Sequence, residues 1–329
     1  MQKRIWITWE KQRRNSTLSK ALNAKLFEFD LKCTRLLRYP VALCKTVAAF
    51  VAERPDLIFV QNPSLILALF AVNYGLIADI PVVVDAHNAG VYPFNGRRTW
   101  ASKLAAYLFK KAFITIVTNN ALAEYVSMHG GNAEVMPDPI PEFTPPVTKR
   151  VLKGNFNVLF ICSWADDEPY DEVIQAARLL SKSVYVYITG NSRGKESKYV
   201  GNMPENVVLT DYLKEEDFIE MLYSCDVIMD LTTRDDCLVC GAYEAVAAEK
   251  PLIVSNSKAL MVYFSHGVLY TNNTSSDISA QIDSAVIMKD DMQNQIKVLK
   301  KNMMDEWYDR LQKMEMNLRV RLKTRGAKV

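Results

Sequence analysis

The sequence predicts an α/β protein made of two doubly wound, Rossmann-like domains. Three observations lead to this prediction: a length of 329 residues, apolar runs that alternate with helical patterns, and a proline-rich break near the middle. A chain of this length is too long for most single cores and fits two domains of ordinary size. Strands that alternate with helices are typical of parallel sheets covered by helices on both faces.

Six strands are predicted in the first half, where short apolar runs recur at 4–8, 25–29, 57–61, 81–85, 114–118 and 134–136. Helical patterns separate them at 15–22, 39–53, 64–74, 99–112 and 120–129. The prolines at 137, 139, 141, 145 and 146 cannot continue a regular element, because proline fixes φ and lacks a backbone N–H. This passage is the predicted linker between the domains.

The second half repeats the alternation, with strands predicted at 156–161, 184–189, 207–210, 227–230, 252–254 and 268–270. Helices are predicted at 169–180, 215–224, 241–249 and 276–286. A last helix, 290–321, carries apolar residues at three- and four-residue spacing and should have one apolar face. The predicted parts are therefore a first domain at 1–145, a second at 146–288, and a C-terminal helix with a basic tail at 289–329.

Charge is unevenly distributed along the chain. Residues 1–150 carry a net charge of +8, residues 151–308 carry −10, and residues 309–329 carry +5. A positive field concentrates an anionic partner such as a phospholipid surface, a lipid pyrophosphate or nucleic acid. Nucleic acid is disfavoured because the basic half contains no identifiable recognition module. Scattered, solvated Lys and Arg are the alternative explanation.

The remaining composition is that of a packed cytoplasmic protein. The six cysteines are scattered, and Cys237 and Cys240 lack the second Cys or His pair that a metal site needs, so reduced thiols are expected. The N-terminus has no secretory signal pattern. The longest apolar run, 65–80, is interrupted by Asn73 and Asp79 and is predicted to be a buried helix. We expect a cytoplasmic location, with a peripheral position on the inner face of the membrane as an option.

The stretch 236–255, DCLVCGAYEAVAAEKPLIVS, is the most informative in the chain. It places two carboxylates, Asp236 and Glu244, eight residues apart around a small-residue turn that opens a helix. Gly241 and Ala242 allow a ligand to approach the backbone, and the free N–H groups of a helix start favour an anion. Glu244, predicted on the first turn, is then within reach of that ligand's hydroxyls.

This segment resembles the donor-binding signature of the GT-B glycosyltransferases. It is similar to the large retaining nucleotide-sugar family of the bacterial surface polysaccharide type, in which an acid is followed by seven residues and a second Glu. The resemblance is carried by Asp236, Glu244, Ala245, Ala247, Pro251 and Ser255. Two departures are the first acid, which is Asp rather than Glu, and Glu249-Lys250, which stand where the family usually has a glycine turn.

The resemblance implies an enzyme that moves a hexose from a nucleotide diphosphate sugar to a lipid-linked or glycan acceptor. It implies two domains facing a cleft, with the acceptor side in the first domain, the donor side in the second, and the last helix crossing back to the first. The sugar nucleotide is a co-substrate, and no other cofactor is expected. No Asp-x-Asp motif occurs at a strand end, so no divalent metal is expected either.

The catalytic residues implied by the resemblance are Asp236, on the transferred sugar, and His87, which follows the strand ending at Asp85. Glu244 is implied to contact the donor ribose. Asn88, next to His87, is a predicted partner for acceptor hydroxyls. A capping or core role is the alternative for His87, and a solvated carboxylate is the alternative for Glu244.

Further donor-binding residues follow from the same comparison. The loop Ser163 to Tyr170 is acidic where relatives place Arg and Lys against the donor pyrophosphate, so the positive charge must come from elsewhere. The predicted donor-binding residues are Ser163, Arg193, Lys195, Asp211, Tyr212, Leu213, Arg234, Cys237 and Leu238. Among these, Arg193, Lys195 and Arg234 are the candidate cations, and 211–213 match the position that frames the base.

The acceptor prediction rests on the loop TWEKQRRN after the first strand. Its guanidinium groups suit an acceptor phosphate, so Arg13, Arg14 and Asn15 are predicted to bind the acceptor. A solvated helix start is the alternative. The basic tail from Leu318 to Arg325 is an alternative contact for an anionic membrane surface.

Two other functional classes stay open. A sugar-nucleotide epimerase or a phosphorylase can use the same twin-domain fold. A binding protein with a decayed site is the third option, because the usual basic residues of the phosphate loop are missing.

Overall fold

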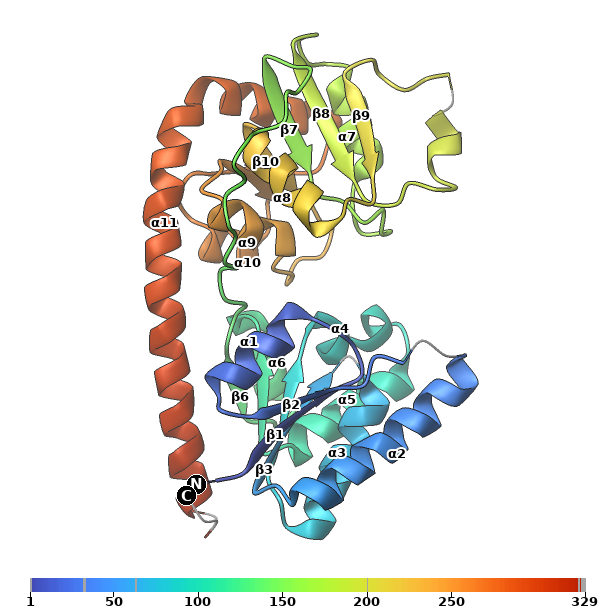
Figure 1. Ribbon diagram of the computed structural model, residues 1–329, viewed down its shortest axis with the longest axis vertical. Coiled ribbons are helices and arrows are strands. Elements are labelled where there is room, and N and C mark those ends of the chain that lie inside the picture. The colour runs from blue at the N-terminus through green and yellow to red at the C-terminus, as the bar shows by residue number, and fades with distance from the viewer. Residues whose placement is uncertain (1, 32–33, 63, 200, 325, 327–329) are drawn as a thin grey trace. The chain divides into compact units, whose positions relative to one another are not determined.

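The computed structural model describes residues 2–31, 34–62, 64–199, 201–324 and 326. Its contacts divide the chain into two compact units, Met1–Pro139 with Glu306–Val329, and Ile140–Asp305. Each unit is built around one six-stranded parallel sheet (Figure 1). The predicted α/β class with two doubly wound sheets is confirmed, and the strand order follows the doubly wound pattern.

Unit 1 contains six strands and their connecting helices. The strands are β1 (Arg4–Thr8), β2 (Lys25–Glu28), β3 (Leu57–Asn62), β4 (Val82–Ala86), β5 (Ile114–Val117) and β6 (Ala133–Val135). The helices are α1 (Arg13–Ala21), α2 (Arg35–Glu53), α3 (Leu65–Ala78), α4 (Asn88–Val91), η1 (Pro93–Gly96), α5 (Thr99–Lys111) and α6 (Asn120–Met128). The sheet order is β2-β1-β3-β4-β5-β6.

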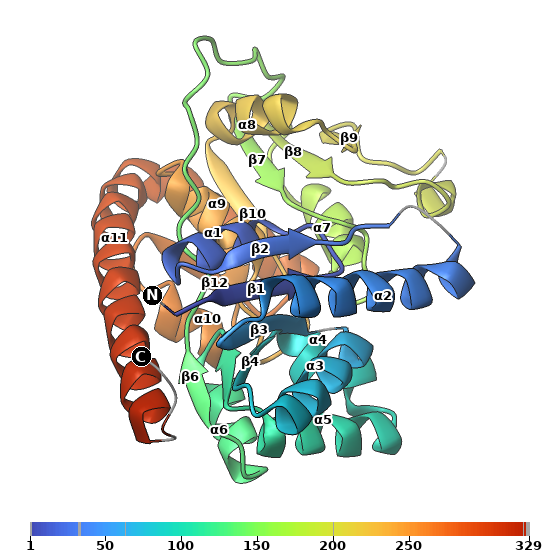
Figure 2. The same cartoon turned by 60° about the horizontal axis from the view of Figure 1, so that its bottom comes forward.

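Both faces of this sheet are buried, so β3, β4 and β5 read as continuous apolar runs and not as alternating ones. One face packs against α2, α3, α5 and α6, whose buried residues include Phe50, Leu67, Leu108 and Leu122. The other face packs against α1 and the end of the last helix. Three of these helices, α2, α3 and α5, run side by side in Figure 2.

Unit 2 repeats the arrangement. Its strands are β7 (Phe156–Phe160), β8 (Val184–Thr189), β9 (Val207–Asp211), β10 (Val227–Asp230), β11 (Leu252–Ser255) and β12 (Val268–Thr271). Its helices are α7 (Tyr170–Ala177), η2 (Glu196–Tyr199), α8 (Glu215–Ser224), α9 (Cys240–Ala247) and α10 (Lys258–Tyr263). The sheet order is β12-β11-β10-β7-β8-β9.

The last helix differs from its prediction. One continuous helix, α11 (Ser275–Thr324), replaces the two helices predicted at 276–286 and 290–321. The residues between them, Ile287, Met288 and Lys289, include no Gly or Pro that would end a helix. The first part of α11 packs in unit 2, where Ile278 and Ile282 are buried, and the part from Glu306 onward belongs to unit 1.

The end of α11 is part of the unit 1 core. Trp307, Met314, Leu318 and Leu322 are buried against β1, β3 and α1 residues, and Trp307 Nε1 donates to the carbonyl of Pro137 at 3.1 Å. Leu318 and Leu322 of the tail are therefore buried inside unit 1. A contact between the basic side chains of the tail and an anionic membrane stays a prediction.

The twelve predicted strands all occur, with ends shifted by one residue at most. The helices that the sequence reading missed, α4, η1, η2 and α10, are short, and they show too few turns for a 3.6-residue apolar period to register. The loop predicted after β1 is present at residues 9–12, but α1 begins at Arg13 and so includes Arg13 and Arg14, two residues earlier than predicted.

The turn after α9 explains the departure at Glu249. Glu249 has φ of 56°, the left-handed conformation that a helix-ending glycine usually adopts. Its carboxylate is 3.0 Å from Lys300 Nζ on α11. The backbone of Glu249 is therefore strained, at a position where the GT-B family that the sequence resembles usually has a glycine turn.

This strain predicts a difference between two substitutions. Glu249→Gly and Glu249→Ala both remove the ion pair with Lys300, but only Gly relieves the positive φ. The Gly variant should be more stable than the Ala variant by about 1 kcal/mol, because a left-handed residue with a Cβ costs roughly that amount. Urea unfolding midpoints check this, and equal midpoints for the two variants would show that the turn relaxes at no cost.

Candidate functional site

The order of the strands marks one point in each sheet where ligands of open α/β sheets bind. The direction of chain progress reverses between β1 and β3 in unit 1 and between β7 and β10 in unit 2. Ligands lie outside the carboxyl ends of the strands at such a point. The loops after β1, β7 and β10 therefore border the expected ligand positions.

The loop after β7 is folded around its own carboxylate. Glu168 accepts hydrogen bonds from the backbone N–H groups of Ser163 at 2.9 Å and Ala165 at 2.8 Å, and from Ser163 Oγ at 3.0 Å. Trp164 lies between them with φ of 63° and donates from Nε1 to the carbonyl of Thr189 at 3.0 Å. Ser163 thus lies in the loop after β7, as predicted, and its backbone N–H and hydroxyl groups both donate to Glu168.

A second acid joins this loop to the loop after β10. Asp167 accepts from Thr232 Oγ1 at 2.9 Å and from Arg234 Nη2 at 3.1 Å, and its carbonyl accepts from the N–H of Thr233 at 2.8 Å. Arg234, one of the three candidate cations, is thereby fixed beside the acidic loop. The acidic character of this loop was predicted from the sequence. The hydrogen bonds by which Asp167 and Glu168 fix the conformation of the loop were not.

Asp230 ends β10 and caps the signature helix. Its Oδ2 accepts from the N–H of Gly241 at 2.7 Å, and a Cβ at Gly241 would lie only 2.6 Å from the same oxygen. Burial, together with the nearby charges of Glu168 and Glu244, raises the pKa of Asp230 well above its usual value, although the Gly241 hydrogen bond acts against this. Gly241 is therefore required because the buried carboxyl group of Asp230 approaches its backbone closely. The sequence had instead suggested that a ligand approaches the backbone at Gly241.

The two signature carboxylates lie on either side of this cap. Asp236 is half-buried in the loop before α9, together with Cys237 and Leu238. Glu244 is half-buried on α9, close enough to Asp230 to influence its pKa. Because α9 begins at Cys240, Glu244 is the fifth residue of the helix, and the prediction that it lies on the first turn is wrong by a residue or two. Burial raises the pKa of the Cys237 thiol to about 11, although Arg234 acts against it.

Of the other candidate cations, the structure brings Lys195 to the β7 loop. Its ammonium group donates to the carbonyl of Trp164, lies 3.6 Å from Asp166 Oδ1, and sits 4.9 Å above the centre of the Tyr170 ring. Arg193 is exposed in the loop after β8. One cation is thus placed beside the predicted phosphate loop, and one is left at the surface.

The residues predicted to frame the base follow β9. Asp211 has φ of 57°, and its carboxylate accepts from Ser192 Oγ at 3.3 Å, while its carbonyl accepts from the N–H of Gly190 at 3.1 Å. Tyr212 is exposed and Leu213 packs partly into the core. This segment lies at the sheet edge formed by β8 and β9, two strands away from β7.

In unit 1, Arg14 is the centre of a buried ion-pair network. Its side chain contacts Asp85 Oδ1 at 2.7 Å, Asp138 Oδ1 at 2.8 Å and the carbonyl of Met136 at 2.8 Å. Burial disfavours the ionised form of Asp85, but the positive charge of Arg14 and the neighbouring His87 favour that form more strongly. The pKa of Asp85 therefore lies well below its usual value. Arg14 is 5 % exposed, so its guanidinium lies inside the unit.

Asn15 is also buried at the start of α1. It accepts from Trp6 Nε1 at 3.0 Å and donates to Gln61 Oε1 at 3.0 Å, and Gln61 also bonds to Thr8. These contacts tie α1 to β1 and β3 at the point where the strand order reverses. The side chains of Arg14 and Asn15 thus hold the framework there, whereas Arg13 is exposed on the same turn.

His87 lies where the sequence predicted, just after β4 and immediately before α4. Its carbonyl accepts from the N–H groups of Gly90 and Val91 at 2.7 and 2.9 Å, so its backbone caps the short helix. Its Nε2 lies 3.6 Å from Asp85 Oδ2, beyond hydrogen-bond distance, and its side chain is one-quarter exposed. Asn88 is half-buried next to it. The imidazole is therefore held beside the Arg14 network with part of its surface accessible.

Other features of the described residues are as follows. No helix in the described parts of the chain is both long and apolar enough to cross a bilayer. In the same parts, no cluster of three or more His, Cys, Asp or Glu side chains is arranged to hold a metal ion, and metal independence stays a prediction. The five described cysteines are free thiols, and Cys33 lies outside the described residues.

Comparisons with known proteins agree with this arrangement. Residues 149–302, nearly all of unit 2, match the family model described as glycosyl transferases group 1. A search of curated proteins gave no match.

Three solved structures illustrate the similarity in fold. Sucrose-phosphate synthase from Thermosynechococcus elongatus is 13 % identical, with a TM-score of 0.79, 98 % of this chain covered and 100 % of that one. HepE from Anabaena, solved with UDP and glucose, is 16 % identical, with a TM-score of 0.67 and coverages of 97 % and 91 %. A putative UDP-N-acetylglucosamine 2-epimerase from Listeria monocytogenes is 12 % identical, with a TM-score of 0.57 and coverages of 89 % and 91 %. The chain thus has the GT-B fold, and its second unit matches the group 1 glycosyltransferase family.

Proposed function

We propose that this protein is a glycosyltransferase that moves a hexose from a nucleotide diphosphate sugar to a lipid-linked or glycan acceptor in bacterial surface polysaccharide synthesis. The observation that carries the proposal is the family match over unit 2, which spans both loops at the point where its strand order reverses. HepE, a structure of similar fold, was solved with UDP and also with UDP-glucose. A nucleotide sugar in unit 2 fits both facts.

We assign the donor to the residues around α9. Glu244 is proposed to bind the donor ribose and Asp236 the transferred sugar. Lys195 and Arg234 flank the β7 loop and are proposed to stabilise the leaving pyrophosphate, with Arg193 as a further cation. Ser163, Cys237 and Leu238 line the same loops, and 211–213 are proposed to frame the base.

We assign the acceptor side to unit 1. His87 is proposed to contact the transferred sugar near the reacting centre, and Asn88 to bind acceptor hydroxyls. Arg13 remains the candidate for an acceptor phosphate because it is exposed. Arg14 and Asn15 support this site by holding α1 in place, because their side chains are buried and bonded within the unit. The proposed place of action is cytoplasmic and peripheral to the membrane.

Ligand-induced thermal stabilisation provides the direct test. We expect one of UDP, GDP or dTDP to raise the melting temperature, because a ligand that binds only the folded state stabilises it by mass action. The matching sugar nucleotide should then support transfer. No shift with any nucleotide would leave a binding protein with a decayed site as the better explanation.

Substitutions at Asp236 and His87 should separate turnover from nucleotide binding. Asp236→Asn and His87→Ala are each expected to reduce transfer by about tenfold or more, the effect of losing roughly 1.4 kcal/mol of transition-state stabilisation. Free nucleoside diphosphate should bind as before, since both residues are assigned to the sugar. Asp235→Asn, at the exposed neighbour, is the matched control, and near wild-type transfer in both variants would refute the assignment.

An epimerase is the second candidate, because the Listeria monocytogenes structure of similar fold carries that description. A phosphorylase shares the same fold-level argument. The need for an acceptor separates these classes. Conversion of a sugar nucleotide without a second sugar or lipid would indicate an epimerase, whereas phosphate-dependent cleavage of a glycan would indicate a phosphorylase.

A further inference from the structure

Three neighbouring helices of unit 1 expose an unusual amount of apolar surface. Among the exposed positions of α2 from Leu37 to Ala52, Lys45 is the only charged residue. The apolar positions include Leu37, Val41, Cys44, Ala48 and Val51, spaced four and three residues apart, so they form one stripe along the helix. A solvent-facing helix normally carries charged and polar residues on this side.

The stripe continues onto α3, which contains no charged residue. Ile66, Leu76 and Ile77 of α3 are exposed. The two helices are packed together, because the ring of Phe50 on α2 lies 4.7 Å from that of Tyr74 on α3. Two adjacent helices thus both expose apolar side chains, and an exposed apolar surface of this kind marks an interaction site.

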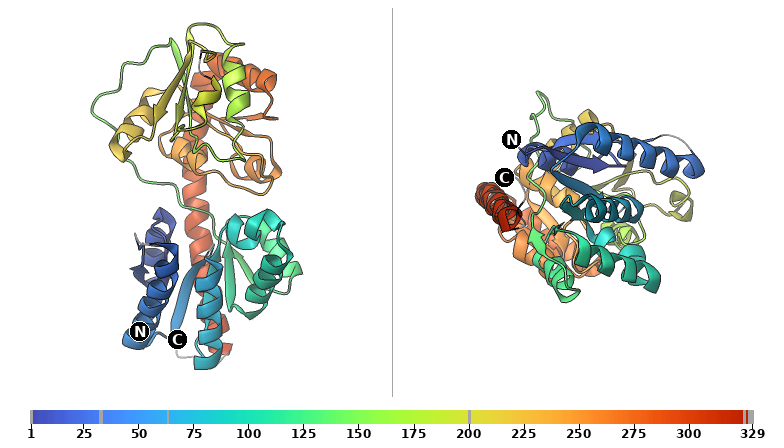
Figure 3. Two further views of the ribbon diagram at one scale, coloured as in Figure 1. Left: turned by 90° about the vertical axis from the view of Figure 1, so that its right-hand side faces the viewer. Right: turned by 90° about the horizontal axis from the view of Figure 1, so that it is seen from below.

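The third helix, α5, adds positive charge. Tyr107 Oη of α5 donates to Asn73 Oδ1 of α3 at 2.8 Å, which joins the helices. Figure 3 shows α2, α3 and α5 side by side in its right-hand view. The three helices contain one acid, Glu53, which is paired with Lys25, and the exposed Asp79 directly follows α3. The basic residues described on or next to the face are Arg38, Lys45, Arg97, Arg98, Lys103, Lys110 and Lys111.

Two exposed aromatic side chains, Phe94 of η1 and Trp100 in the first turn of α5, lie at the start of this helix. Phe94 has φ of 55° although it is bulky, and Asn95 and Gly96 follow with φ of 54° and 72°. Its ring lies 5.8 Å from that of Trp100, and the Arg98 guanidinium lies 5.0 Å from its centre. The strained backbone at Phe94 costs free energy, and the exposed ring gains little from burial to offset that cost. Strain of this kind points to a functional contact.

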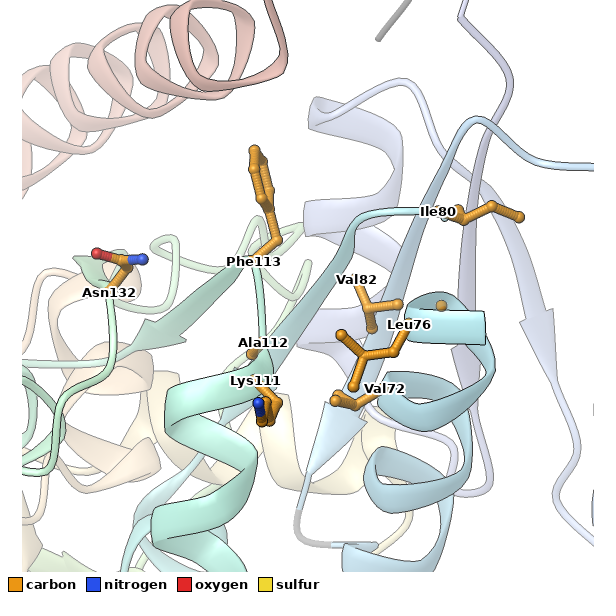
Figure 4. A pocket seen from close by; sticks show the side chains of 9 residues that line it. Val72, Leu76, Ile80, Val82, Lys111, Ala112, Phe113 and Asn132 are labelled. Atoms are coloured by element: carbon orange, nitrogen blue, oxygen red, sulfur yellow. The ribbon is translucent and has the colours of Figure 1, made fainter. Parts of the chain in front are cut away.

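The opposite end of the face is hollowed. A cavity of about 280 Å³ lies between the end of α3, the start of β4 and the end of α5 (Figure 4). Val72, Leu76 and Val82 line it with apolar side chains, and the exposed Lys111 lies beside them. Since β4 begins here, the hollow is remote from the carboxyl ends of the strands. It therefore lies apart from the candidate site, and it shares the exposed Leu76 with this face.

We propose that the surface formed by α2, α3, α5 and the loop 94–100 docks on an anionic lipid bilayer. Exposed aliphatic and aromatic side chains enter the interface, and the bordering Lys and Arg contact lipid phosphates. The occupant is a membrane and not a single partner helix, because the apolar face is at least two helices wide and its border is basic. This inference specifies the proposed membrane partner and is independent of the transfer chemistry.

The test compares two matched pairs of exposed positions. Val51 and Ile77 on the face are 62 % and 89 % exposed, and Val262 and Ile287 in unit 2 are 69 % and 85 % exposed. The double variants Val51→Glu/Ile77→Glu and Val262→Glu/Ile287→Glu therefore make the same chemical change at similar exposure. Binding is measured by co-sedimentation with phosphatidylcholine vesicles, with and without phosphatidylglycerol.

The wild type and the unit 2 variant are expected to bind vesicles that contain phosphatidylglycerol, with binding that falls as salt rises. The face variant should bind at least tenfold more weakly while keeping its melting temperature and nucleotide binding. Equal binding by the two variants would overturn the proposal, as would equal wild-type binding to vesicles without phosphatidylglycerol. A wild-type dimer in sedimentation that dissociates in the face variant, with no vesicle binding, would instead assign the face to a second copy of the chain.

Discussion

Replacing Arg14 by alanine is expected to lower the free energy of unfolding by about 3–5 kcal/mol. Arg14 is buried between Asp85 and Asp138, and its removal leaves the carboxylate of Asp85 buried without its main partner. Breaking a buried ion pair from one side carries a penalty of this size. Urea unfolding measures it, and Arg13→Ala is the matched control, because the exposed neighbour should change stability by no more than about 0.5 kcal/mol.

Two further measurements separate the network from ordinary packing. Arg14→Met combined with Asp85→Leu should cost less than the sum of the single changes, because no lone charge is left in the interior. Because the folded pKa of Asp85 is depressed, its contribution is fully present above the usual pKa of 3.8 and is lost as the pH falls toward the folded value. Additive effects of the two substitutions would contradict the network.

Glu244→Ala is expected to weaken donor binding by about 1.5–3 kcal/mol, the size of a hydrogen bond to a charged group. This corresponds to roughly a 10- to 150-fold rise in the dissociation constant. The fold should be unaffected, because Glu244 is only half-buried and alanine is favoured within a helix such as α9. Calorimetric titration with the nucleotide that gives the largest thermal shift measures the effect.

Glu216→Ala, on the exposed start of α8, is the matched control for this substitution. It changes the same residue type in unit 2 away from α9 and should leave binding unchanged. If Glu244→Ala binds the nucleotide with wild-type affinity, Glu244 does not contact the ribose. Such a result would leave the family match of unit 2 in place but remove the residue-level assignment.

The loop after β7 lacks the cations that the resembling enzymes have there, and a cation from another loop lies beside it. The β7 loop carries Asp166, Asp167 and Glu168 where the resembling enzymes have cations, and Glu168 satisfies the backbone N–H groups of Ser163 and Ala165. Lys195 supplies a positive charge beside them from the loop after β8. The acidic loop after β7 thus has a cation beside it, which comes from a different loop. The amino-acid sequence had not shown which cation would lie there.

The two parallel sheets, the linker prolines, and the places of Asp236, Glu244 and His87 relative to strand ends could all be predicted from the amino-acid sequence. These features are local, because a buried parallel strand needs a continuous apolar run and a helix needs its own period. The roles assigned to Asp236, Glu244 and His87 came from resemblance and stay predictions.

Which charged residues are buried and which are exposed could not be predicted, because it depends on contacts between distant parts of the chain. Arg13 and Arg14 are adjacent in sequence, yet the pitch of α1 directs one outward and the other into contact with Asp85 and Asp138, which are distant in sequence. The same holds for the tail, whose Leu318 and Leu322 are covered by unit 1, and for α2, whose apolar stripe stays uncovered. An apolar periodicity predicts that a face exists, but what covers that face depends on residues far away in the chain.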